Sequence, residues 1–162
     1  MLIENQTKMP FFDMKNAKDL YKKLEYDFNI LTNDKMNNFN YMNFIFTASH
    51  LKDWVNEDKN ESEMLKVKVN EVFNFDSNLE YSTIRSLCNK SKHFYLKKEY
   101  EKEMIREEGF DFGKIDFSNF SFNPIYYYVE VRDKKVELYD VCKKVFEDWS
   151  KVIIGEENYE IK

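Results

Sequence analysis

Apolar residues return at three- and four-residue steps along the first part of the chain, which is the spacing of an amphipathic helix. Between Asp13 and Leu31 they form one stripe, which consists of Ala17, Leu20, Leu24, Phe28 and Leu31. Asp13 is placed to act as the N-cap of this helix. The polar run Thr32-Asn33-Asp34 ends the pattern, so we expect a break there and then a second helix.

Residues 35–56 carry apolar side chains over more than half of a helical circumference. One line of this helix contains Phe39, Met42, Phe46 and Ser49, and a neighbouring line contains Tyr41, Ile45, Ala48 and Val55. A helix that is apolar on so many sides is expected to be the central one. A short helix over 62–73 follows, with Leu65, Val69, Val72 and Phe73 inward. The alternation of Leu65, Val67 and Val69 leaves a strand as the alternative for this segment.

Two further helices are predicted in the second half of the chain. Ser77 and Glu80 have the spacing of a capping box. The helix that they open carries Leu79, Thr83, Ile84 and Leu87 and ends near His93. The last helix covers about 136–154, with a stripe of Leu138, Val141, Val145, Trp149 and Val152. Gly155 then provides a C-terminal stop.

Between these two helices the pattern changes to a period of two, which is typical of β-structure. Aromatic pairs alternate between Gly109 and Phe122, and Ile125 to Arg132 is the strongest strand, followed by a turn at Asp133-Lys134-Lys135. Residues 94–96 are either extended or continue the preceding helix into the charged segment 97–108. The fold class is therefore mainly α, a bundle of about four main helices with a small aromatic β ribbon inserted before the last helix. We expect a single domain over 1–162, with the ribbon insertion at 109–132.

Composition narrows the classes of function. The chain has 162 residues, 17% of them aromatic, with only 3 Gly and 2 Pro, which favours one helical domain with a sizeable core. Its net charge of −5 gives no general nucleic-acid footprint, so contact with RNA would need a local basic patch. We expect a cytoplasmic protein, since no apolar run could span a membrane and the N-terminus does not resemble a signal peptide. Cys88 and Cys142 are interpreted as reduced, mostly buried thiols, with a disulfide as the alternative.

Side chains that could carry chemistry gather on the helix that ends at His93. At 100° per residue, one arc of about 140° holds a guanidinium, a thiol, an amide, an ammonium and an imidazole. They belong to Arg85, Cys88, Asn89, Lys92 and His93. One interpretation is a solvated helix end whose cations complement the helix dipole. The other is an anion or RNA-phosphate site in which His93 acts as a general acid or base.

The segment Cys88-Asn89-Lys90-Ser91-Lys92-His93 resembles the motif of the HEPN superfamily of helical bundles: Arg, a polar residue that is often Asn, three residues and His. The spacing from Asn89 to His93 matches, whereas Cys88 stands at the Arg position and Arg85 lies one turn earlier. The wider layout also resembles small HEPN-like proteins of bacterial and phage type; it consists of His50-x-x-Asp53-Trp54, Asn89-x-x-Lys92-His93 and a final helix with Trp149. The resemblance implies metal-independent RNA cleavage by the Arg and His of two facing protomers.

The second histidine, His50, shares a helix face with Asp53 and lies beside Trp54. A carboxylate near an imidazole fixes its tautomer and raises its basicity. One interpretation is a partly buried, satisfied histidine at a helix seam. The other is a site shared by His50, Asp53 and His93, in which the two histidines approach each other. Two His and one carboxylate match an open metal site, but no HExxH spacing or Cys pair supports it, so we expect no metal and no cofactor.

These residues lead to one hypothesis and one alternative. The hypothesis is a HEPN-like protein that contacts RNA or a protein partner in phage defence or a toxin–antitoxin system. Its candidate catalytic residues are His93, Asn89 and Arg85, and its candidate binding residues are His50, Asp53 and Lys92. If the chain is an enzyme, we expect a metal-independent ribonuclease with weak or no activity. The alternative is a non-enzymatic module whose aromatic ribbon mediates formation of a homodimer.

Overall fold

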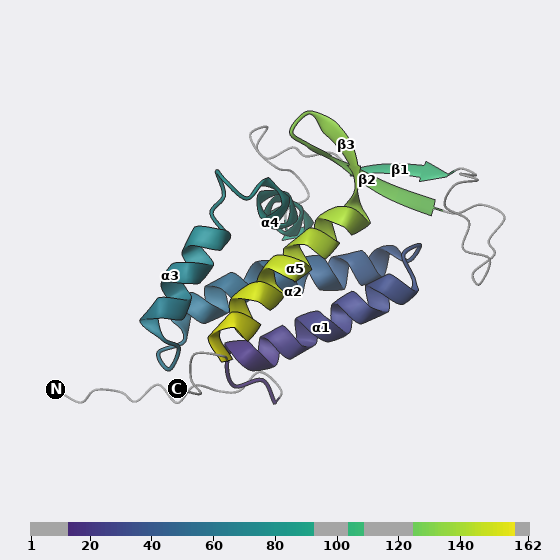
Figure 1. Ribbon diagram of the computed structural model, residues 1–162. Coiled ribbons are helices and arrows are strands. Elements are labelled where there is room, and N and C mark those ends of the chain that lie inside the picture. The colour runs from purple at the N-terminus through teal and green to yellow at the C-terminus, as the bar shows by residue number, and fades with distance from the viewer. Residues whose placement is uncertain (1–12, 93–103, 109–124, 158–162) are drawn as a thin grey trace.

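The computed structural model of the protein describes residues 13–92, 104–108 and 125–157. Within these residues the order is α1 (Ala17–Asn33), α2 (Asn38–Glu57), α3 (Glu63–Val72), α4 (Leu79–Lys92), β1 (Met104–Glu108), β2 (Ile125–Val131), β3 (Lys134–Glu137) and α5 (Leu138–Glu157). The helices surround the hydrophobic core, and the small sheet lies at the N-terminal end of α5 (Figure 1). The prediction of a mainly α fold with a small β ribbon before the last helix is confirmed.

The first helix begins later than its apolar pattern predicted. The side chain of Asn16 accepts a hydrogen bond from the main-chain N–H of Asp19 at 2.9 Å, so Asn16 is the N-cap and the predicted cap at Asp13 is wrong. The helix ends at Asn33, within the predicted polar break. The predicted stripe is buried at four of its five positions, and Phe28 is partly buried against the core.

The second helix, α2, is the central one, as predicted, because it packs against each of the other four helices. It begins after Asn37, whose side chain accepts from the Phe39 N–H at 3.0 Å, and not at Lys35. Phe39 and Met42, which were assigned to an apolar line, are 66% and 40% exposed. At 100° per residue Phe39 projects about 180° away from the buried Ala48, which explains its exposure.

Caps also define α3 and α4. Ser62 accepts from the Leu65 N–H at 3.0 Å and begins α3, so the strand alternative for this segment is excluded. The N-cap of α4 is Asn78, whose Oδ1 accepts from the Tyr81 N–H at 2.9 Å. The predicted capping box of Ser77 and Glu80 is therefore wrong by one residue. The Asn78 amide also donates to the carbonyl of Val72 at 3.0 Å, and this second bond holds it at the cap position.

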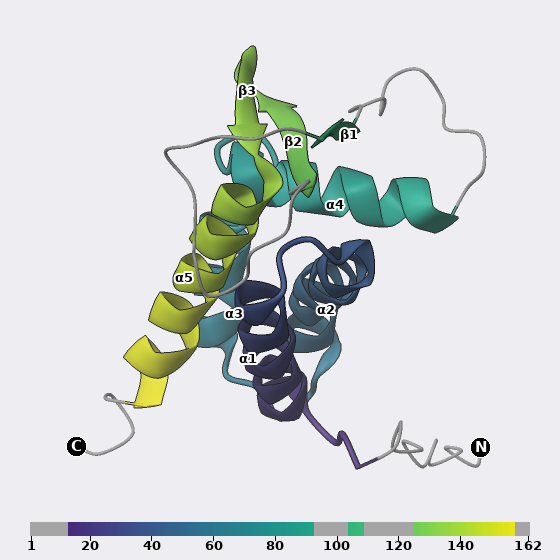
Figure 2. The same ribbon diagram turned by 90° about the vertical axis from the view of Figure 1, so that its right-hand side faces the viewer.

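The fourth helix crosses the central helix at a steep angle. In Figure 1, α4 is seen nearly end-on while α2 lies across the picture. In Figure 2, turned by 90°, α4 is seen lengthwise above α2. The two helices are in contact, so side chains on one face of α4 meet side chains on α2 along a seam.

The sheet has three antiparallel strands in the order β1-β2-β3. Tyr127, Val129 and Val131 of β2 are buried, and the alternation matches the predicted period of two. The hairpin turn is Arg132–Asp133, with φ of 53° and 57° as in a type I′ turn, so β2 ends at Val131 and the predicted turn residues Lys134 and Lys135 belong to β3. β1 falls within the charged segment that precedes the expected ribbon, and residues 109–124 lie outside the described residues.

The last helix begins at Leu138, because β3 remains paired with β2 through Glu137. It continues through Gly155, so the predicted stop there is wrong. Gly155 instead gives room to Lys68, whose Nζ lies 2.9 Å from the position of an added Cβ and donates to the carbonyl of Val152 at 3.4 Å. The fully buried Trp149 stacks on Phe73 with ring centroids 3.9 Å apart, which fixes α5 against the end of α3.

Candidate functional site

The α2–α4 seam brings several of the predicted site residues together. We use this name for Ser49, His50 and Asp53 of α2 with Tyr81, Arg85 and Cys88 of α4. Tyr81, Arg85 and Cys88 follow one another at steps of four and three residues, so they share one face of α4. Ser49 and Asp53 are four residues apart and share a face of α2.

Arg85 is fixed at the centre of this seam. Its Nη1 donates to Oδ2 of Asp53 and to the main-chain carbonyl of Ser49, both at 2.8 Å. The hydroxyl of Tyr81 donates to the same carbonyl at 3.3 Å. Burial alone would lower the pKa of Arg85, but the hydrogen bond and the charge of Asp53 outweigh burial and raise it. The guanidinium is therefore permanently charged and held by partners on the neighbouring helix.

Cys88 lies about one helical turn after Arg85 on α4, and it faces His50 of α2. Nε2 of His50 lies 3.7 Å from Sγ of Cys88, within the range of a weak hydrogen bond to sulfur. Cys88 is fully buried and His50 is half-buried. Cys88 and Cys142 are both free, buried thiols, as the sequence predicted. The residue at the Arg position of the HEPN-like motif is thus a thiol packed against an imidazole.

A second cation, Lys52, lies beside Arg85. Its Nζ donates to the carbonyl of Phe73 at 2.8 Å and lies 4.9 Å from the ring centroid of Phe75 and 5.9 Å from that of Tyr81. Burial lowers the pKa of Lys52, the nearby charge of Asp53 raises it, and that of Arg85 lowers it further. The ring of Phe75 is 47% exposed and stacks against Tyr81 with centroids 5.8 Å apart.

The structure brings three of the predicted site residues together, and part of the remaining site lies outside the residues that it describes. Arg85 and Asp53 form an ion pair and His50 lies in the same seam, so these three are brought together. Asn89 is half-buried next to Cys88 on α4. The side chain of Lys92 and the whole of His93 lie outside the described residues, so the site shared by His50, Asp53 and His93 stays a prediction.

Sequence reasoning missed the roles of Tyr81, Lys52 and Phe75. Tyr81 stands four residues before Arg85, and this helical spacing could have placed it on the same face. The approach of Lys52 to Phe75 depends on the packing of α2 against the α3–α4 connection, which no local pattern encodes. In the described part of the chain no three His, Cys, Asp or Glu side chains are grouped as a metal site, and no helix is both long and apolar enough to cross a membrane.

We compared the chain with protein-family models, with curated proteins and with solved structures, and none of them matches it. The geometry of the seam therefore carries the functional argument.

Proposed function

We propose that the chain is a HEPN-like helical protein that binds single-stranded RNA at the edge of the α2–α4 seam without cleaving it. The proposal rests on the hydrogen bonds that Arg85 makes within the seam. Its guanidinium is bound by Asp53 and by the Ser49 carbonyl, and Cys88, at the Arg position of the motif, is buried. A guanidinium held in this way supports the packing of two helices and is drawn away from the charge that develops on phosphate during RNA cleavage.

Side chains suited to single-stranded RNA lie at the same edge of the seam. The exposed ring of Phe75 offers a surface on which a base can stack, and the neighbouring Lys52 supplies positive charge for a phosphate. Asp53 compensates the charge of Arg85, which leaves one cation at this edge, so we expect weak binding that falls only modestly with salt concentration. A role in phage defence or in a toxin–antitoxin system is what the resemblance implies for such a protein.

Fluorescence anisotropy with a short, labelled single-stranded RNA tests the binding at low salt. Phe75→Ala should weaken binding about 5- to 150-fold, since stacking of a base on an aromatic ring contributes about 1–3 kcal/mol. Tyr26→Ala is the matched control, because Tyr26 is an exposed aromatic residue on α1 and should have no effect. Absence of RNA binding at low salt, or equal losses in the two variants, would contradict the proposal.

A non-enzymatic interaction module is the second candidate, and two exposed apolar side chains favour it. Phe39 and Met42 lie one turn apart on α2 with large exposed fractions, and exposed apolar patches mark contact surfaces. This candidate predicts self-association in sedimentation velocity that Phe39→Ser abolishes. A monomer at all concentrations, with RNA bound at Phe75, would favour the first candidate.

A further inference from the structure

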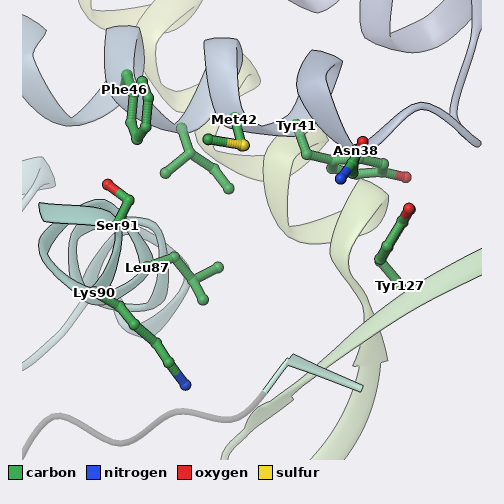
Figure 3. Close-up of a pocket in the computed structure, with 9 residues that line it drawn as sticks. Asn38, Tyr41, Met42, Phe46, Leu87, Lys90, Ser91 and Tyr127 are labelled. Atoms are coloured by element: carbon green, nitrogen blue, oxygen red, sulfur yellow. The ribbon is translucent and has the colours of Figure 1, made fainter. Parts of the chain in front are cut away.

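A hollow of about 370 Å³ lies between α2, α4 and β2. Its lining residues precede Asp53 on α2 and follow Arg85 on α4. Its apolar wall consists of Tyr41, Met42, Ile45, Phe46 and Leu87. Figure 3 shows Phe46 and Met42 reaching from α2 and Leu87 reaching from α4 into the same space, with Tyr127 facing them from β2. A concave, largely apolar site of this size is typical of small-molecule binding.

Lys90 is the only charged residue among the described residues that line the hollow. Its side chain is exposed, and in Figure 3 it extends from α4 beside Leu87 and away from Phe46 and Met42. Two hydroxyl groups in the lining already donate elsewhere: Ser91 donates to the carbonyl of Cys88 at 2.6 Å and Tyr127 donates to the carbonyl of Met36 at 3.4 Å. The side-chain donors that the described lining leaves for a ligand are therefore the Lys90 ammonium, the amide of Asn38 and the hydroxyl of Tyr41, of which only Lys90 carries a charge.

The volume and the charge together define the class of ligand. A space of 370 Å³ holds about a dozen non-hydrogen atoms, if each takes about 30 Å³ as a water molecule does in the liquid. The apolar wall favours a hydrocarbon or aromatic body, and the single, exposed ammonium of the described lining favours one anionic end. A second copy of the chain would need a contact of about 800 Å² on each partner, so it would have to cover surface beyond the nine residues of this lining.

We propose that this hollow binds a small amphipathic carboxylate, with its apolar body between α2 and α4 and its carboxylate at the ammonium of Lys90. The site shares no residue with the α2–α4 seam, so the proposal is independent of RNA binding. Met42 lies in the apolar wall and its methyl group reports on occupation of the hollow.

Octanoate is the probe, and the measurement is the ¹³C-methyl spectrum of methionine in the full chain. The Met42 signal should shift with saturation at a dissociation constant near or below about 1 mM. Met64 is the internal control, because it is an exposed methionine on α3, outside the lining. Its signal should not move, and assignment comes from single Met42→Leu and Met64→Leu variants.

The charge of Lys90 is tested with a neutral ligand of the same chain length. Lys90→Met should weaken octanoate binding about three- to fivefold, as expected for an ion pair with an exposed lysine, and should leave octan-1-ol binding unchanged. Lys143→Met is the matched control, since Lys143 is an exposed lysine on α5, and it should change neither affinity.

Three results would overturn the proposal. The first is a Met42 signal that does not respond to octanoate, or that moves together with that of Met64. The second is equal binding of octanoate and octan-1-ol with no effect of Lys90→Met. The third is a Met42 signal that depends on protein concentration, which would show that a second copy of the chain covers the hollow.

Discussion

Arg85 of α4 and Asp53 of α2 form an ion pair in which Nη1 and Oδ2 are 2.8 Å apart. The same Nη1 donates to the carbonyl of Ser49. The pair therefore links two crossing helices through a side chain and through the backbone. Its side chains are 24% and 46% exposed, so water screens part of the attraction.

We expect Asp53→Asn to lower the free energy of unfolding by about 0.5–1 kcal/mol, because a screened ion pair contributes little more. Urea denaturation followed by circular dichroism measures the change. Glu63→Gln is the control, since the Glu63 carboxylate that pairs with Lys66 is 87% exposed, and its loss should be smaller still. A loss above about 3 kcal/mol, the size seen for buried pairs, would contradict this account of the seam.

A second charged network lies between α1 and α2. The buried carboxylate of Asp27 accepts from Lys23 Nζ and from Thr47 Oγ1, both at 2.5 Å. Thr47→Val keeps the shape but removes the hydroxyl, so we expect a loss of about 1.5–3 kcal/mol in the free energy of unfolding. Thr32→Val, at an exposed position of α1, should change it by less than about 0.5 kcal/mol. Similar values for the two variants would show that the network does not matter for stability.

The cap of α4 gives a third prediction, in which neighbouring residues behave differently. Asn78→Ala should cost about 1–2 kcal/mol, because it removes the cap and also the bond to Asp148 of α5. Ser77→Ala should be nearly neutral, since Ser77 is exposed and is not the cap. Thermal or urea unfolding of the two variants decides between the two residues, and a larger loss in Ser77→Ala would restore the predicted capping box.

The helices could be predicted from the sequence, whereas their ends and the site could not. The stripes of α1 and α5 repeat over several turns, so local periodicity was enough to identify them. Ser77 and Asn78 are both good N-caps, and the choice between them depends on Val72 and Asp148, which only the folded chain places beside Asn78. In the same way, Arg85 was assigned to a cationic arc because its partner, Asp53, lies on another helix.

Burial of Cys142 links stability to pH. Burial raises the pKa of its thiol well above the ordinary value of about 8.5. The folded state therefore keeps the proton while the unfolded state loses it, so the free energy of unfolding should fall as pH rises above about 8.5, by up to about 1.4 kcal/mol per pH unit. Burial also raises the pKa of Tyr41 and Tyr81, which add to the fall above about pH 10.

Urea unfolding at pH 8, 9 and 10 under reducing conditions measures this slope. Cys142→Ala should be less stable at every pH, because it leaves a small cavity, but its slope between pH 9 and 10 should be flatter than that of the unchanged protein. Equal slopes in the two proteins would show that the Cys142 thiol does not cause the alkaline loss.

The central claim is that the chain binds single-stranded RNA without cleaving it. The most direct test incubates the purified chain with single-stranded RNA and a metal chelator, and measures both cleavage and binding. A denaturing gel and an anisotropy measurement on the same samples give both quantities. With Arg85 held by Asp53 and a thiol at the Arg position of the motif, we expect bound, intact RNA from the unchanged protein and from His93→Ala and Asn89→Ala. Efficient cleavage that His93→Ala abolishes would contradict the account and show that Arg85 or another cation serves catalysis.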